Sequence, residues 1–311
     1  MPSELSSGKL PDFEDNKLSR LAREIKGILS GMGCSEVYNY SFTSAKALMG
    51  TGEDPQVALR LKNPISPDLE FMRTNLASSL LRNIALNQDN YKGISIFEIA
   101  RVYFPNKNDL PKEEQRLCIA IKSGSRFVGQ TYFDTKGIIE YLLQKQNISK
   151  PSYKKINSSY LDSAQEIFVS GDSMGVIGLV SPKAKDSFGI KGEVSVLEIS
   201  LESLVKYFGT TKQFVPISKF PTASRDINIV INKNINILEI EKAISESALE
   251  HILSFEIQDI YEGKGLPESK KSVTINMVFG SKERTLLDAE IIKEMNAVIK
   301  RLECIGGALR E

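Results

Sequence analysis

The last third of this 311-residue chain carries a periodic pattern that few folds can satisfy. DINIVIN alternates apolar with polar residues as a strand does, and a helical pattern follows over 237–249. ILSFEIQDIYE and KSVTINMVF then predict two strands joined by GKGLPES, whose Gly and Pro suit a hairpin connection. A second helical pattern over 288–302 ends at Gly306 and Gly307, and ALRE fits an edge strand. This βαββαβ order predicts one sheet with two helices on a single face.

The first two thirds of the chain mix helical and strand patterns without regular alternation. The spacing of apolar residues predicts helices over 16–30, 73–87 and 133–146, the last with Asp134 as its N-cap, and a short helix at LESLVKYF. Strand patterns occur at EVYNYSF (36–42), VALRLK (57–62), ISIFEIARVYF (94–104), LCIAIK (117–122), EIFVSG, MGVIGLVS and VSVLEIS. Several strands follow one another through short turns, which favours an antiparallel or mixed sheet with helices packed on it.

The polar, proline-containing segment GTTKQFVPI marks a boundary between these two patterns. It predicts a linker at 209–217 that separates a domain at 1–208 from a second domain at 218–311. A length of 311 residues is sufficient for two domains.

Composition excludes several classes of protein. A net charge of +1 gives no global basic field, so any nucleic-acid site must be a local patch. Cys34, Cys118 and Cys304 are far apart and form no CxxC pair, which predicts reduced thiols in a cytoplasmic protein. No apolar run approaches the roughly 18 residues of a membrane span, and the N-terminus is not a signal peptide. The single histidine, His251, cannot supply a two-histidine metal site, and no metal ligands are predicted.

The pattern from 218 onward resembles the ferredoxin-fold anticodon-binding domain that closes the β subunit of bacterial-type phenylalanyl-tRNA synthetase. Upstream segments resemble, in order, the catalytic-like module of the same subunit, whose fold is similar to class II aminoacyl-tRNA synthetase cores. These segments are LKNPISPDLEFMRTNLASSLLRNIALNQ, ISIFEIARVYF, YFDTKGIIEYLL, MGVIGLVSP and VSVLEISLESL. The expected fold class is therefore α+β: a class II synthetase-like antiparallel sheet with helices, followed by a ferredoxin-like domain.

Catalysis by this chain is not expected. A class II site needs one arginine on a motif strand and another on a Gly-rich strand-to-helix element, because both offset the phosphate charge of ATP. FEIARVY supplies Glu98 and Arg101, but VSVLEISLESL contains neither Arg nor a Gly run. Arg101 is therefore predicted to be a structural or interface residue, and Arg73 a loop anchor. GDSMGVIG (171–178) lacks the GxxxxGK[ST] pattern of a phosphate loop.

The predicted hairpin DIYEGKGLPESKKS concentrates the chemistry that RNA needs. Tyr261 offers a flat ring on which a base can stack, which is worth about 1–3 kcal/mol. Lys264, Lys270 and Lys271 could meet phosphates, and Ser272 could donate to a base edge or a phosphate.

Arg225 in FPTASRD opens the first strand of the same sheet and completes the candidate RNA-binding set. The resemblance implies that Tyr261 stacks on the first anticodon base and that Ser272 lies beside it. Residues 218–311 contain 13 Lys and Arg against 15 Asp and Glu, so charge alone favours a solvated turn. Only the resemblance favours RNA, and a few phosphate contacts predict modest, salt-sensitive affinity.

The resemblance implies a C-terminal part of the β subunit of an α2β2 phenylalanine–tRNA ligase. Residues 1–208 would dock against and support the catalytic α subunit, which binds phenylalanine, ATP and Mg²⁺, and residues 218–311 would bind the anticodon stem-loop of tRNA-Phe. No cofactor is expected in this chain. Two alternatives remain: a stand-alone, non-catalytic interaction scaffold, including a naturally short paralogue, and an independent ATP-dependent ligase, which the missing arginine clamp disfavours. Apolar surface left exposed on residues 1–208 would favour the subunit.

Overall fold

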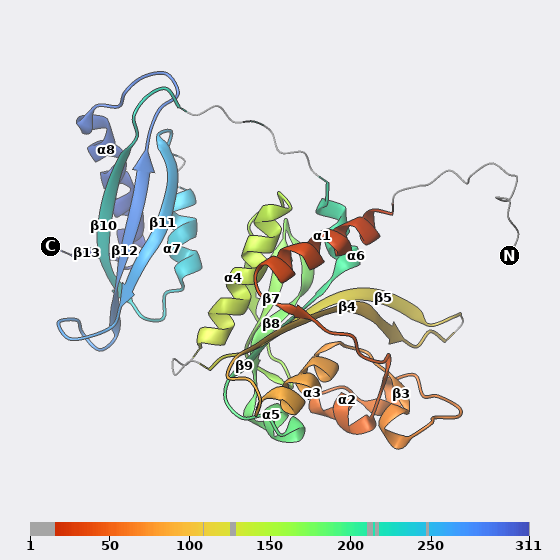
Figure 1. The fold of residues 1–311 in the computed structure, drawn as a ribbon. Coiled ribbons are helices and arrows are strands. Elements are labelled where there is room, and N and C mark those ends of the chain that lie inside the picture. The colour runs from red at the N-terminus through yellow and green to blue at the C-terminus, as the bar shows by residue number, and fades with distance from the viewer. Residues whose placement is uncertain are drawn as a thin grey trace, which may run out of the picture. The chain divides into compact units, whose positions relative to one another are not determined.

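The computed structural model describes residues 16–107, 109–124, 129–209, 214, 218–246 and 249–310. The chain divides into two compact units, 1–212 and 213–311, which are described separately below (Figure 1). Most of the predicted linker at 209–217 lies outside the described residues. No helix within the described ranges is long and apolar enough to cross a membrane.

The first unit is built on a seven-stranded sheet (Figure 1). Its strands are Ser35–Glu36 (β1), Ile94–Phe104 (β4), Lys112–Lys122 (β5), Ser152–Lys155 (β6), Leu161–Val169 (β7), Asp172–Val180 (β8) and Val194–Ser200 (β9). They lie in the order β1-β4-β5-β9-β8-β7-β6, and all pairs are antiparallel except β1 with β4 at one edge. A separate two-stranded ladder joins β2 (Phe42–Thr43) to β3 (Phe71–Met72).

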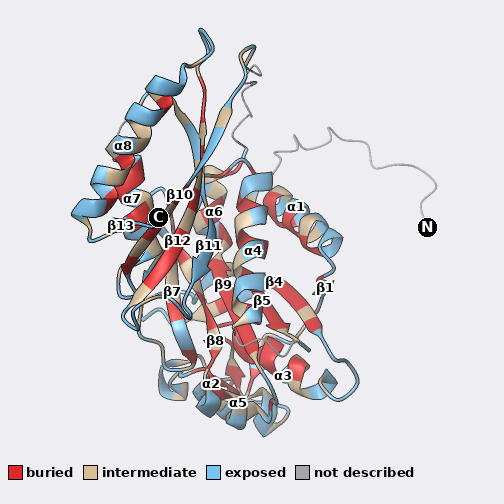
Figure 2. Ribbon diagram, turned by 90° about the vertical axis from the view of Figure 1, so that its left-hand side faces the viewer, coloured by how far each residue is buried: buried red, intermediate tan, exposed pale blue. Residues whose placement is uncertain are grey.

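Helices cover both faces of this sheet, and the buried residues in Figure 2 follow the central strands and the inward sides of these helices. One apolar layer joins the sheet to α1 (Lys17–Gly31), α4 (Gln130–Lys145) and α6 (Leu201–Leu204). The other joins it to α3 (Ala77–Asn87) and α5 (Pro182–Phe188), with α2 (Ala45–Gly50) against both of these helices. Three short 3₁₀ turns lie at Pro55–Val57, Pro67–Leu69 and Val205–Tyr207.

The predicted α+β class is confirmed, and β4 spans 94–104 and pairs with β5 as expected. Two strand predictions were wrong. The alternation in EVYNYSF comes from aromatic rings that point to solvent, since Tyr38 is 80% and Tyr40 is 77% exposed. The strands in this region are limited to Ser35–Glu36 and Phe42–Thr43. VALRLK forms no strand and contributes one isolated bridge, from Arg60 to Phe71. The short elements β6, α2 and α5 were not predicted, because each spans too few residues to show a periodic pattern.

The N-terminus of α4 shows why Asp134 was a wrong N-cap prediction. The helix begins at Gln130, preceded by Gly129 in the left-handed region at φ 83°. The carboxylate of Glu193, far away in the sequence, accepts hydrogen bonds from the Gly129 amide (2.6 Å), the Thr131 amide (3.2 Å) and the Thr131 hydroxyl (2.7 Å). A tertiary contact therefore caps this helix.

We expect Glu193→Ala to destabilise the protein by about 1 kcal/mol at neutral pH, because it leaves helix-terminal amides without an acceptor. Burial disfavours the charged form of Glu193, but the bonds from Gly129 and Thr131 outweigh it, so its pKa lies below the ordinary 4.5. This stabilisation is therefore present above pH 4.5 and is lost as the pH falls through the folded-state pKa. The urea midpoint, measured from pH 3 to pH 7, should fall less steeply with decreasing pH for Glu193→Gln than for wild type.

Asp134→Ala is the control for this prediction. The Asp134 carboxylate is exposed and accepts only from the Gln130 side chain (2.8 Å), so its loss should change the free energy of unfolding by a few tenths of a kcal/mol. A larger effect at Asp134 than at Glu193 would contradict the assignment of the cap.

The second unit has the expected βαββαβ order (Figure 1). Its strands and helices are Ala223–Asn232 (β10), Ile237–Ser245 (α7), Ile252–Tyr261 (β11), Lys270–Phe279 (β12), Asp288–Cys304 (α8) and Ala308–Leu309 (β13). The antiparallel sheet runs β11-β12-β10-β13, so ALRE does supply an edge strand. Alternate residues of β10 and β12, including Ile229 and Ile275, pack with α7 and α8 into one core. Among the described residues of this unit, no helix packs on the opposite face of the sheet.

Candidate nucleic-acid interface

The helix-free face of the second sheet carries every other residue of its strands. Ile227, Ile229 and Ile231 point into the core, so the even-numbered residues of β10 point to the other face. The strand register places Tyr261 opposite Ser272, and Ser272 opposite Val230. Tyr261 and Ser272, which were predicted from the sequence, are therefore direct cross-strand neighbours on this open face.

The hairpin backbone holds the ring of Tyr261. Its hydroxyl donates to the carbonyl of Lys264 (3.2 Å), yet the residue remains 42% exposed. A Cβ on Gly263 would lie 2.5 Å from the tyrosine oxygen, so only glycine lets the hairpin approach the ring so closely. The ring is thus ordered before any ligand binds, which lowers the entropy cost of stacking.

A polar cluster lies beside the tyrosine. The Ser272 hydroxyl, although only 3% of that residue is exposed, donates to Asn228 Oδ1 (2.6 Å) and accepts from a guanidinium nitrogen of Arg310 (3.4 Å). The Arg310 amide donates to the Asn228 carbonyl (2.9 Å), which fixes the C-terminal strand against β10. Sequence reasoning missed Asn228 and Arg310, because only strand pairing brings 228, 272 and 310 together.

Lys271 corrects one predicted contact. Only 7% of the residue is exposed, and its ammonium donates to the carbonyls of Lys233 (3.3 Å) and Ile235 (2.7 Å). It lies on the same side of β12 as the buried Val273, so it anchors the turn after β10 instead of facing a phosphate. Lys264 is exposed and Lys270 half-buried at the hairpin, where both ammonium groups can reach a ligand.

Arg225 lies away from this cluster. It is opposite Met277, toward the other end of β12 from Ser272, and its odd position directs it to the helix side. There it pairs with Asp288 at the start of α8 (3.0 Å). Arg225 therefore lies apart from the hairpin residues with which it was predicted to bind RNA, and its contact with RNA stays a prediction.

Charge is unevenly distributed on the open face. Toward the far end, the Asn276 amide donates to Ser224 and to Asp226 (2.7 Å each), and Glu256 lies opposite Asn276. The hairpin end carries Lys264, Lys270 and Arg310, together with the exposed Glu268 and with Glu262, which pairs with Lys233 (3.2 Å). The cations that could meet a phosphate therefore lie at the hairpin end, although residues 218–311 are net acidic.

In the first unit, the two arginines considered for an ATP site are both paired within the protein. Arg101 extends to solvent and pairs with the exposed Glu113 (2.8 Å), and β9 and α6 contain no arginine. Arg73, in contrast, is buried: it donates to Glu98 (2.9 Å) and to the carbonyls of Arg101 (2.9 Å) and Tyr40 (3.5 Å), which agrees with a loop anchor. The described residues contain no group of three or more side chains that could hold a metal ion.

The charged groups over the centre of this sheet are already paired. Arg116 lies between Glu114 (3.2 Å) and Glu198 (3.0 Å), so its guanidinium is not open to a phosphate. The second oxygen of Glu198 accepts the amides of Leu76 and Ala77 (3.1 Å each) at the start of α3. Burial raises the pKa of Glu198, and Arg116 opposes that rise. These paired residues join β5, β9 and the start of α3 to one another.

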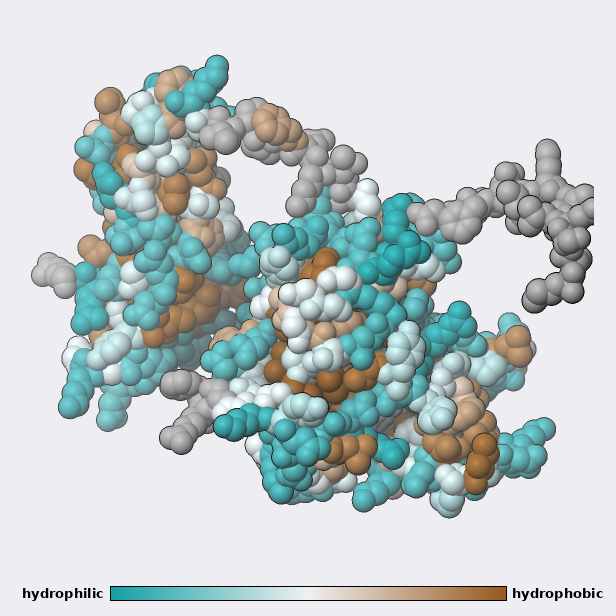
Figure 3. All heavy atoms as spheres, in the orientation of Figure 1, coloured by the Kyte–Doolittle hydropathy of each residue, from teal (hydrophilic) through white to brown (hydrophobic). Residues whose placement is uncertain are grey.

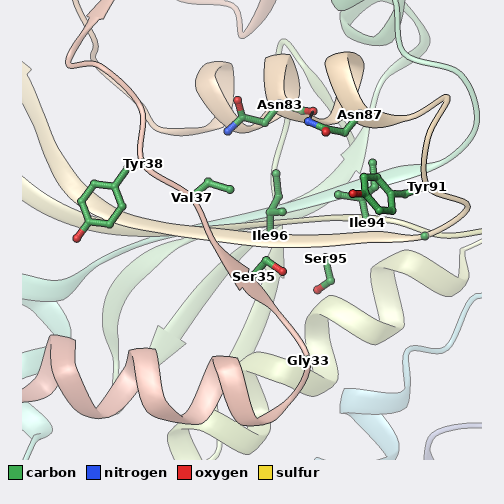
Figure 4. Close-up of a pocket in the computed structure, with 11 residues that line it drawn as sticks. Gly33, Ser35, Val37, Tyr38, Asn83, Asn87, Tyr91, Ile94, Ser95 and Ile96 are labelled. Atoms are coloured by element: carbon green, nitrogen blue, oxygen red, sulfur yellow. Dashed lines mark hydrogen bonds between the residues drawn. The ribbon is translucent and has the colours of Figure 1, made fainter.

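Apolar and aromatic side chains are exposed where the sheet ends at β1. A groove of about 560 Å³ runs between α3 and the chain around β1, with Asn83 and Asn87 above it and Val37 and Ile96 below (Figure 4). Figure 3 shows hydrophobic residues gathered over β3 and the chain before it. Large exposed side chains in this region are Tyr38, Tyr40, Phe42, Met49, Val57, Ile65, Leu86 and Tyr91.

Known proteins match both units. Residues 1–201 match the family described as the phenylalanyl tRNA synthetase beta chain CLM domain, and residues 218–310 match the ferredoxin-fold anticodon binding domain. The phenylalanine–tRNA ligase beta subunit of Dehalococcoides mccartyi is 32% identical over 311 residues, which cover 96% of this chain and 38% of that protein. The beta subunit of Thermotoga maritima is 28% identical, covering 90% and 36% respectively. These matches give no support to a stand-alone scaffold.

A solved structure supports the fold of the larger unit. The pyrrolysyl-tRNA synthetase of Desulfitobacterium hafniense superposes with a TM-score of 0.51 at 15% identity, covering 60% of this chain and 65% of that one. At this identity the likeness concerns the fold alone. It confirms the predicted class II synthetase-like architecture.

Proposed function

Because this chain belongs to the phenylalanyl-tRNA synthetase β-chain family, we propose that it works as part of phenylalanine–tRNA ligase, with residues 218–310 binding the anticodon stem-loop of tRNA-Phe. The chain spans a little over a third of the length of the curated relatives it matches, so the activity of the whole enzyme is part of the proposal. The observation that carries it is the ordered Tyr261 ring beside the cluster of Ser272, Asn228 and Arg310 on a helix-free sheet face.

Each group of this face has a distinct task under the proposal. Tyr261 stacks on an anticodon base, and stacking tolerates any base because every base has a π-face. The half-buried Asn228 offers its amide to a base edge, which supplies discrimination, and the buried Ser272 hydroxyl holds Asn228 in place. Arg310, Lys264 and Lys270 neutralise phosphates, and so few contacts predict moderate affinity that weakens with salt.

Tyr261→Ala should weaken binding of a tRNA-Phe anticodon hairpin by about 10- to 100-fold, because a stacked base is worth about 1–3 kcal/mol. Fluorescence anisotropy at low salt measures this directly. Tyr261→Phe keeps the ring and loses only the bond to the Lys264 carbonyl, so its affinity should stay within a few-fold of wild type. A hairpin with a changed first anticodon base should bind wild type more weakly than the unchanged hairpin does. The two hairpins should bind the alanine variant with equal affinity. Binding indifferent to both changes would remove anticodon recognition from this face.

The exposed aromatic surface around β1 is the proposed docking site of the α subunit. Contiguous exposed apolar side chains mark protein interfaces, and Tyr38, Tyr40 and Tyr91 are of the type enriched there. The short parallel strand β1 also leaves one sheet edge open to a partner. In this proposal the α subunit binds phenylalanine, ATP and Mg²⁺ in a cytoplasmic α2β2 assembly, and residues 16–209 support it without contacting the reacting groups.

A further inference from the structure

A second groove lies in the first unit, along the solvent side of α4. Its volume is about 730 Å³, and it separates the helix from the chain that leads to β6. Gly137 and Gln144 on the helix and Ser149 and Lys150 on the loop are among its lining residues. A Cβ on Gly137 would meet nothing within 4 Å, so the helix backbone is open to a ligand at this point.

Two lysine–tyrosine pairs flank this groove. The Lys145 ammonium lies 5.1 Å from the centre of the Tyr141 ring, and Tyr141 lines the groove. The Lys136 ammonium lies 4.5 Å from the centre of the Tyr153 ring on β6. Lys155 is two residues further along the strand and therefore points to the same side as Tyr153.

The surface is locally basic. From 136 to 155 the chain contains five lysines and one acidic residue, Glu140. That carboxylate already accepts from the Tyr153 hydroxyl (3.2 Å) and lies 3.9 Å from the Lys136 ammonium. In contrast, residues 218–311 are net acidic, so this groove presents a higher local density of positive charge than the anticodon unit does.

Protection of the sheet edge does not explain this charge. Lysines on the edge strand β6 block pairing with another sheet, which accounts for Lys154 and Lys155. Lys136, Lys145 and Lys150 lie on the helix and the loop, where there is no edge to protect. Lys150 lines the groove, and the other two lie at its rim, Lys145 over the ring of Tyr141 and Lys136 beside Glu140. Edge protection therefore leaves these three lysines unexplained.

We propose that the α4 groove binds the sugar–phosphate backbone of tRNA outside its anticodon arm. This inference rests on the proposed function, because it assumes that the chain's ligand is a tRNA. Ammonium groups at the rim neutralise successive phosphates and release their counterions, and the tyrosine faces pack against ribose or an unstacked base. Contacts to phosphate and ribose carry no sequence information, so this binding is independent of sequence.

The test compares two RNAs on the full chain. Lys136→Gln/Lys145→Gln/Lys150→Gln removes three charges from the groove and its rim and none from the second unit. Affinity for full-length tRNA-Phe at about 0.1 M salt should fall at least about tenfold, and the slope of log K against log salt should shrink by about 2 to 3. Affinity for the isolated anticodon hairpin should not change. Lys154→Gln is the matched control for Lys155→Gln, since Lys154 lies on the same strand as Lys155 but faces Glu166 on the other side of the sheet.

The outcomes separate this inference from the proposed function. If the triple variant binds full-length tRNA-Phe as tightly as wild type does, the proposal for the groove is overturned, even if Tyr261→Ala weakens the binding of both RNAs. If Lys154→Gln and Lys155→Gln weaken the binding of full-length tRNA-Phe equally, the assignment of the site to the α4 side of β6 is overturned. If the anticodon hairpin does not bind but the triple variant binds full-length tRNA-Phe more weakly than wild type does, anticodon recognition is overturned and the proposal for the groove is supported. Unchanged tRNA binding with weakened binding of the α subunit would assign the groove to a protein partner instead.

Discussion

Replacing Arg73 with methionine should destabilise the first unit by about 3–5 kcal/mol. The Arg73 and Glu98 side chains are only 3% and 2% exposed, so the variant leaves a buried carboxylate without its cation. It also removes donors from the carbonyls of Arg101 and Tyr40, which tie the loop around Tyr40 to β4. Hydrogen exchange of the β4 amides, monitored at increasing denaturant concentration, measures this loss of stability for the first unit alone.

Two variants control the Arg73 experiment. Arg101→Gln removes a salt bridge to Glu113 whose two side chains are 66% and 46% exposed, and it should cost less than about 1 kcal/mol. Arg73→Met combined with Glu98→Gln should be more stable than Arg73→Met alone, because a neutral amide is cheaper to bury than an unpaired charge. An Arg73→Met variant within 1 kcal/mol of wild type would show that the pair does not hold the loop to the sheet.

Gly175→Ala should destabilise the same unit by about 3 kcal/mol or more. A Cβ at this position would lie 2.0 Å from the carbonyl oxygen of Glu198 and 2.7 Å from the Cα of Ile199, both in the backbone of β9. Because backbone cannot move aside as a side chain can, β8 and β9 would have to separate at the centre of the sheet. The φ of 154° adds strain for any residue with a side chain. Thermal unfolding of the variant would measure the loss.

Gly171→Ala is the matched control in the same hairpin. Its φ of 91° also disfavours a side chain, but a Cβ there would meet nothing within 4 Å. The change should therefore cost about 1–2 kcal/mol from backbone strain alone. Equal losses at both positions would mean that backbone conformation, and not the close approach of β8 to β9, decides the requirement for glycine at 175.

Sequence reasoning found part of the candidate RNA interface and missed the rest for a definite reason. Tyr261 and Ser272 stood out because they flank a recognisable hairpin, and the register makes them neighbours. Whether a lysine on a strand meets solvent depends on its parity relative to the core, and Lys271 has the buried parity. Arg310 gave no local signal, since its position beside Ser272 exists only after β13 pairs with β10.

The sequence by itself determined the order of elements in the second unit, the α+β class and the family, because hydrophobic periodicity and ordered motifs are local properties of the chain. Tertiary structure alone decided that Glu193 caps α4, that Arg73 is buried against Glu98 and that Asn228 and Arg310 join Ser272. Each of these contacts links residues at least 25 positions apart, and such pairings are set by strand register and layer packing, which no local window of sequence contains.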